Sequence, residues 1–169
     1  MPSLQRSLTI DVPPARVYEA FADFDRWLEW NPHLRQVKPL CEGPLATGCT
    51  ARIALKLSPF PSVWEVTEVV PGRSFAWASS SIPGVRLTFD HIAEDYDGGT
   101  VATLRVDVEG PLAFLTPITG AFYEHNLGRS LAALKRILEA EAPKSRTRKS
   151  AKSAPRKRKA KPKPKAKNE

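Results

Sequence analysis

Between His33 and Gly110 apolar and polar side chains alternate with a period of two, and this pattern constrains the fold more than any other feature. Successive side chains of a β-strand point to opposite faces, so the alternation predicts strands with one covered face and one wet face. The apolar set is Ile53, Leu55, Leu57, Trp64, Val66, Phe75, Trp77, Val85, Leu87, Phe89, Ala102, Leu104, Val106 and Val108. Another layer of the molecule must cover this face.

Turn-forming residues divide the same region at intervals that suit antiparallel strands. They are Glu42-Gly43-Pro44, Ser58-Pro59-Phe60-Pro61, Pro71-Gly72, Pro83-Gly84 and Asp97-Gly98-Gly99. We therefore expect six consecutive strands with no helix between them, which is a meander.

Helices are predicted before and after the meander in the sequence. Ser3 to Val12 indicates a first strand, and Pro14 suits the first turn of a short helix that follows it. A second, shorter helical turn carries Trp27 and Trp30 and ends where Asn31-Pro32 returns the chain to extended geometry. Because the turn is too short for helical propensity to hold it, we expect both tryptophans to anchor it by burial.

Thr119 to Glu141 predicts a long helix that would cover the sheet. One apolar stripe runs along it through Tyr123, Leu127, Leu131, Leu134 and Leu138. Gly120 and Gly128 weaken this helix, and Gly128 suggests that another part of the molecule approaches the helix closely or that the helix bends there. The expected fold class is α+β, with a seven-stranded antiparallel sheet, two short helices after the first strand and a long C-terminal helix.

The positive charge of the chain is concentrated at its C-terminal end. Residues 1–142 carry 13 Lys+Arg against 17 Asp+Glu, whereas residues 143–169 carry 13 Lys+Arg against Glu169 alone. We expect residues 1–142 to form one domain and residues 143–169 a disordered basic tail, because the tail has no large apolar side chain to bury. The tail either contacts a polyanion such as nucleic acid or an anionic lipid surface, through the cluster Arg156, Lys157, Arg158 and Lys159, or only adds solubility.

Cys41 and Cys49 are the two cysteines of the chain. Without a signal-peptide pattern or a CxxC motif, we interpret them as ordinary thiols of a cytoplasmic protein, although a disulfide is possible if they flank a hairpin turn. The sequence contains no run of about 20 apolar residues, which is the length that a membrane span requires.

Four stretches resemble the SRPBCC superfamily of helix-grip proteins, in particular its polyketide cyclase/dehydrase and lipid-transport branch, with the fold of START domains and the birch pollen allergen. They are "LTIDVPPARVYEAFADFDRWLEWNP", "WEVTEVVPGRSFAW", "TFDHI" and the long terminal helix, and the resemblance spans Leu4 to Glu141. It implies a curved sheet wrapped around the terminal helix, with a cavity between them that binds a small hydrophobic or amphipathic molecule. In some members the cavity also cyclises or dehydrates its ligand. The basic tail is not part of the family pattern.

The candidate ligand-binding residues lie on the apolar strand face, on the short Trp helix, on the loop before the long helix and on that helix itself. They are Trp30, Leu55, Trp64, Val66, Phe75, Trp77, Leu87, Phe89, His91, Leu104, Phe114, Tyr123 and Leu127. The strand aromatics either line a cavity or pack as an ordinary core. The apolar loop from Glu109 to Gly120, which contains Phe114, is either a lid or packing beneath the helix.

No catalytic constellation is visible in the sequence. His91 continues an inward-facing series and Tyr123 lies near the start of the long helix, so these two are weak catalytic candidates, with a structural histidine and a rim tyrosine as the alternatives. His33, His91 and His125 have no metal-site spacing, and no phosphate loop or nucleophile elbow is present, so we expect neither metal nor cofactor. Three functions remain open, namely a carrier or sensor of a hydrophobic molecule, a cyclase or dehydratase, and a module tethered to a polyanion by its tail.

Overall fold

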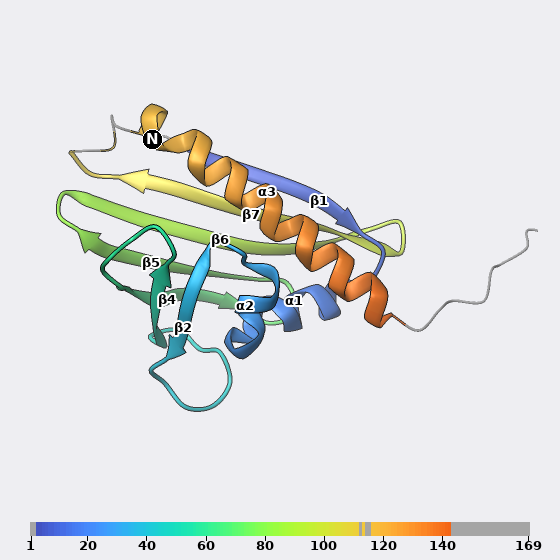
Figure 1. The fold of residues 1–169 in the computed structure, drawn as a ribbon. Coiled ribbons are helices and arrows are strands. Elements are labelled where there is room, and N and C mark those ends of the chain that lie inside the picture. The colour runs from blue at the N-terminus through green and yellow to red at the C-terminus, as the bar shows by residue number, and fades with distance from the viewer. Residues whose placement is uncertain (1–2, 112, 114–115, 143–169) are drawn as a thin grey trace, which may run out of the picture.

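The structure is a computed structural model that describes residues 3–111, 113 and 116–142. A first strand is followed by three short helical segments, six strands and one long helix (Figure 1). The helical segments are α1 (Pro14–Ala22), the 3₁₀ helix η1 (Phe24–Arg26), α2 (Trp27–Trp30) and α3 (Thr116–Glu141). The strands are β1 (Ser3–Ile10), β2 (Leu34–Pro39), β3 (Thr50–Leu55), β4 (Ser62–Val70), β5 (Ser74–Ile82), β6 (Val85–Tyr96) and β7 (Gly99–Glu109).

The strands form one seven-stranded antiparallel sheet in the order β1-β7-β6-β5-β4-β3-β2. The meander of β2 to β7 is as predicted, and β1 joins its far edge by pairing with β7, where Leu8 lies opposite Ala102. The α+β helix-grip fold predicted from the sequence is therefore confirmed.

Helix α3 lies across the sheet along β1 and β7 (Figure 1). Leu127, Leu131, Leu134 and Leu138 of its predicted stripe are at most 3% exposed. The helix begins at Thr116, earlier than predicted, because Pro117 falls in the first turn, where proline is tolerated. A Cβ placed on Gly128 would meet nothing within 4 Å, so the suggested close approach at this glycine is wrong.

The short helical segments cover one end of the sheet, as the burial of their aromatics shows. Trp27 and Trp30 are 3% and 2% exposed, and Trp27 Nε1 donates a 2.9 Å hydrogen bond to the carbonyl oxygen of Phe21. The ring of Phe24 stacks on Trp77 of β5, at a centroid distance of 5.4 Å. The anchoring role predicted for the two tryptophans is confirmed.

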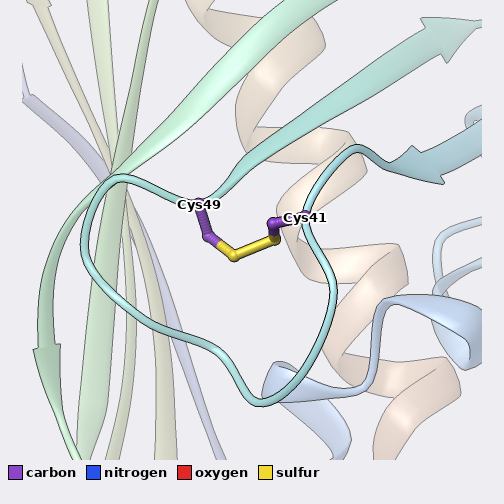
Figure 2. Close-up of a disulfide and its surroundings, with 2 residues drawn as sticks. All are labelled: Cys41 and Cys49. Carbon is purple, nitrogen blue, oxygen red and sulfur yellow. A yellow bond between two sulfur atoms is a disulfide. The ribbon is translucent and has the colours of Figure 1, made fainter.

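The two cysteines form a disulfide, which corrects the prediction of free thiols. The Cys41–Cys49 bond closes the loop between β2 and β3 (Figure 2). The β2 and β3 strands pair as a hairpin, which brings the two Cα atoms to 5.5 Å, within the range that a disulfide spans. The expectation of a cytoplasmic location relied in part on unpaired cysteines, so the disulfide removes that support.

Two predicted strand ends extend too far. The first strand ends at Ile10 instead of Val12, and β3 ends at Leu55, so Leu57 does not join the apolar face and is 80% exposed. In the described segments, no helix has the length and apolar character that crossing a membrane requires. The proposed tail, residues 143–169, lies outside the described residues.

Candidate ligand-binding cavity

A cavity of about 80 Å³, partly open to solvent, lies where the covered face of the sheet meets α2 and α3. Every strand except β1 contributes to it, because the curved sheet turns its apolar face toward α3. Its lining residues are Trp27, Asn31, His33, Leu34, Ile53, Leu55, Ser62, Trp64, Trp77, Phe89, Leu104, Phe122, Tyr123, Asn126, Leu127 and Ser130.

Aromatic rings from successive strands form one wall of the cavity. Trp77 of β5 lies opposite Phe89 of β6 in the strand register, and its ring is 5.2 Å from that of Trp64 on β4. The ring of Trp27 also lies close to Trp77, with the two centroids 4.7 Å apart. These centroid distances suit favourable aromatic contacts, so the wall is held in place by its own packing.

The cavity also has polar groups that lack partners. Asn31 Nδ2, His33 Nδ1, Trp77 Nε1 and Ser130 Oγ are buried and form no hydrogen bond within the described part of the chain. Asn126 differs, because its Nδ2 donates to the carbonyl oxygen of Phe122 at 3.0 Å. A buried polar group without a partner costs about 1–3 kcal/mol, so four such groups around one cavity are the feature that most directly indicates a ligand or bound water.

Burial keeps the two titratable side chains of the cavity neutral. The pKa of His33 is lowered to about 4, mainly by burial and further by the positive charges of Arg129 and Lys56. Burial raises the pKa of the Tyr123 phenol. At neutral pH the cavity therefore presents an uncharged imidazole and a phenol O–H.

Seven of the residues predicted to bind ligand line this cavity. They are Leu55, Trp64, Trp77, Phe89, Leu104, Tyr123 and Leu127. All seven belong to the inward-facing strand positions or to the apolar stripe of α3. The strand period of two and the helical period of 3.6 residues therefore identified them.

Five other predicted residues lie elsewhere, and this corrects their placement. Trp30, Val66, Phe75, Leu87 and His91 are each at most 7% exposed but pack in the core away from the cavity lining. A residue on the covered side of the sheet can belong either to the core or to the cavity lining, because α1 and α2 fill the space over part of that side. Phe114 lies outside the described residues, as do Arg156, Lys157, Arg158 and Lys159.

His91 is a core residue, which argues against its candidacy as a catalytic group. It is 2% exposed and its ring stacks on Phe75 with centroids 4.4 Å apart and planes 4° apart. The ring of Phe21 lies 5.4 Å from that of His91 in an edge-to-face arrangement. Burial lowers the pKa of His91 to about 3, so the imidazole is neutral, and it has no contact with the cavity through which it could move a ligand's proton.

The polar lining residues Asn31, His33 and Ser130 were missed by sequence reasoning because they belong to no apolar pattern. A signal existed in α3, where Asn126 and Ser130 are four residues apart and each precedes a leucine of the buried stripe. Polar residues at that spacing lie beside the stripe on one helix face. Across the part of the chain with described coordinates, no cluster of His, Cys, Asp and Glu side chains could hold a metal ion.

Residues 1–139 match the protein family described as polyketide cyclase / dehydrase and lipid transport. No curated protein is recognisably similar to the chain in sequence.

Solved structures share the fold at low sequence identity. Protein TTHA0849 of Thermus thermophilus is 15% identical, with a TM-score of 0.69 over 84% of this chain and 100% of that one. The ZhuI aromatase/cyclase of Streptomyces sp. R1128 is 20% identical, with a TM-score of 0.67 over 82% of this chain and 93% of that one. Ara h 8.0201 is 13% identical, with a TM-score of 0.65 over 82% and 98% of the two chains. At these identities the likeness establishes the fold alone.

Proposed function

Because the chain belongs to the polyketide cyclase / dehydrase and lipid transport family, we propose that it binds a small hydrophobic or amphipathic molecule in the cavity between sheet and α3, as a carrier or sensor. The observation that supports this most is the combination of an aromatic wall with buried polar groups that lack partners. Pockets for small molecules have this composition, in which apolar walls supply affinity and a few polar groups fix orientation.

Thermal unfolding with neutral apolar probes tests the proposal. We expect 2-naphthylmethanol to stabilise the full chain, since a ligand at 100 times its dissociation constant adds about 2.7 kcal/mol. For a domain of this size that corresponds to ~5–10 °C in Tm. A panel of aromatic and aliphatic alcohols that leaves Tm unchanged would overturn the proposal.

Variants that fill the cavity locate the binding. Leu127→Trp places a larger ring at a buried lining position, and Leu55→Trp does so at a partly exposed one that tolerates overpacking better. Both should abolish the ligand-induced shift in Tm. Leu28→Trp, at a residue 48% exposed on α2, is the matched control and should retain the shift. Equal shifts in all three variants would show that the probe binds elsewhere.

An enzyme of the cyclase or dehydratase class is the second candidate, and the neutral His33 and Tyr123 on one cavity favour it. A neutral imidazole accepts a proton and a phenol donates one, which are the roles that a dehydration needs. Under this alternative, His33→Gln and Tyr123→Phe would lose turnover while they keep binding. A carrier would lose at most some affinity in either variant.

The basic composition of residues 143–169 favours a polyanion contact outside the cavity. Such binding would be non-specific and would weaken steeply with salt, because each Lys or Arg that meets a phosphate releases a counterion. Removal of residues 143–169 should abolish retention on a nucleic-acid column at low salt. Unchanged retention by the shortened chain would contradict the contact.

A further inference from the structure

Two cations lie near His33, which is one of the residues that line the cavity. The backbone N–H of Lys56 donates a 3.0 Å hydrogen bond to the carbonyl oxygen of His33, directly after the lining residue Leu55. Arg129 precedes the lining residue Ser130 in α3. Both side chains are exposed, and the charges of both act on the His33 imidazole.

Neither cation has an acidic partner among the residues that the structure describes. Some surface cations form ion pairs, as Arg26 does with Glu141 at 2.6 Å and Lys135 with Glu139 at 2.9 Å, whereas others, such as Arg52 and Arg136, form none in the described segments. Lys56 and Arg129 form no such pair within 4.0 Å in the described segments. Among the described residues that line the cavity, none is an Asp or a Glu. This edge of the cavity is therefore positively charged and uncompensated.

Three of the unpartnered polar side chains that line the cavity can each donate a hydrogen bond. Asn31 Nδ2 can only donate, and the Ser130 hydroxyl and the neutral His33 ring can each donate as well as accept. A ligand group that satisfies them must supply acceptor lone pairs. A carboxylate has two oxygens that only accept, and hydrogen bonds from protein groups to a charged oxygen are about twice as strong as neutral ones.

We propose that the ligand is an amphipathic acid, with its apolar body against the aromatic wall and its carboxylate at the edge formed by Asn31, Ser130, Lys56 and Arg129. The inference depends on the proposed function, because it assigns the polar end of the same ligand. A ligand with an ammonium head would face like charge at this edge. A neutral alcohol would reach the buried donors but gain nothing from the two cations.

A matched series of naphthalene probes tests the charge preference. The probes are 2-naphthoate, 2-naphthylmethanol and 2-naphthylmethylammonium, titrated calorimetrically into the full chain near neutral pH. We expect the acid to bind about tenfold more tightly than the alcohol, with the ammonium weakest, and the advantage of the acid to shrink at high salt because exposed charges are screened. An acid that binds no more tightly than the alcohol would overturn the inference and leave the proposed function intact. Failure of all three probes to bind would overturn both.

Substitutions assign the preference to this edge. Lys56→Gln and Arg129→Gln should each reduce the ratio of acid to alcohol affinity, and the double variant should bring this ratio close to one. Arg136→Gln, two turns further along α3 and also exposed, is the matched control and should keep the ratio of the unmodified protein. The basic tail is the same in every variant, so its attraction for anions cancels. A ratio that persists in the double variant would overturn the assignment.

Discussion

Replacement of His91 by phenylalanine should make the protein more resistant to acid. His91 is enclosed by aromatic rings, is 2% exposed, and its Nδ1 has no hydrogen-bond partner among the described residues. Protonation would place an unpaired charge in that environment, and burial accordingly lowers the pKa of His91 to about 3 in the folded state. Phenylalanine keeps a flat ring for the stack on Phe75 and cannot be protonated.

The sign and size of the effect follow from proton linkage. In the unfolded chain the His91 pKa has the ordinary value of 6.5, so between about pH 6.5 and pH 3 the unfolded state binds more protons than the folded state. The His91 contribution to stability is therefore complete above pH 6.5 and is lost as the pH falls toward 3. Between about pH 8 and pH 4.5 the loss is about 3 kcal/mol, because stability falls by about 1.4 kcal/mol for each of the two pH units below 6.5. At pH 4.5 this figure depends on the unfolded pKa alone, because the folded pKa lies lower.

Urea unfolding of both proteins at the two pH values measures the effect. The free energy of unfolding should fall by about 3 kcal/mol less in His91→Phe than in the unmodified chain. His33 and the carboxylates titrate in both proteins, so their contributions cancel. His125→Gln, at an exposed position of α3, is the control and should retain the acid sensitivity of the unmodified chain. Equal acid sensitivity in His91→Phe and the unmodified chain would refute the buried, neutral state of His91.

Three further predictions concern stability, each measured by urea unfolding at neutral pH. Gly128→Ala should raise the free energy of unfolding by about 1 kcal/mol, since the new Cβ meets nothing within 4 Å and alanine favours the helix; a loss would show a hidden constraint at this position. Removing the Cys41–Cys49 disulfide by a double substitution to serine should lower the free energy of unfolding by about 2.5 kcal/mol, which is the loop-closure entropy for a sequence separation of 8. Added reductant should have no effect on this variant. Trp27→Phe should cost about 1–3 kcal/mol, because it leaves the buried carbonyl of Phe21 without its donor, and no loss would mean that this hydrogen bond is not formed.

Most of the fold could be predicted because its determinants are local and periodic. Alternation and turn residues predicted six strands, and the leucine stripe predicted α3, since each pattern reports which face of an element is covered. The disulfide was not predicted because pairing of Cys41 with Cys49 depends on the register of β2 on β3. Sequence alone indicates a turn between these strands but not the distance between the two side chains.

The cavity could be predicted only in part, because periodicity identifies an inward face without showing what covers each position. Phe75 and Phe89 both face inward, yet Phe75 packs beneath Phe24 and Trp27, whereas Phe89 borders the open space. The difference arises from where the short helical segments rest on the sheet, which is a tertiary property. The place of His33 at the cavity could not be predicted, because His33 lies in the connection between α2 and β2 and belongs to no helix or strand periodicity.

The proposed function requires that a small apolar molecule occupies the cavity between sheet and α3. Intermolecular nuclear Overhauser effects between 2-naphthylmethanol and the protein measure this most directly. We expect contacts from the naphthalene protons to Trp64, Phe89 and Leu127, which line the cavity from the sheet and from the helix. Contacts confined to the exposed Leu57 and Phe60, or none at saturating probe, would contradict it.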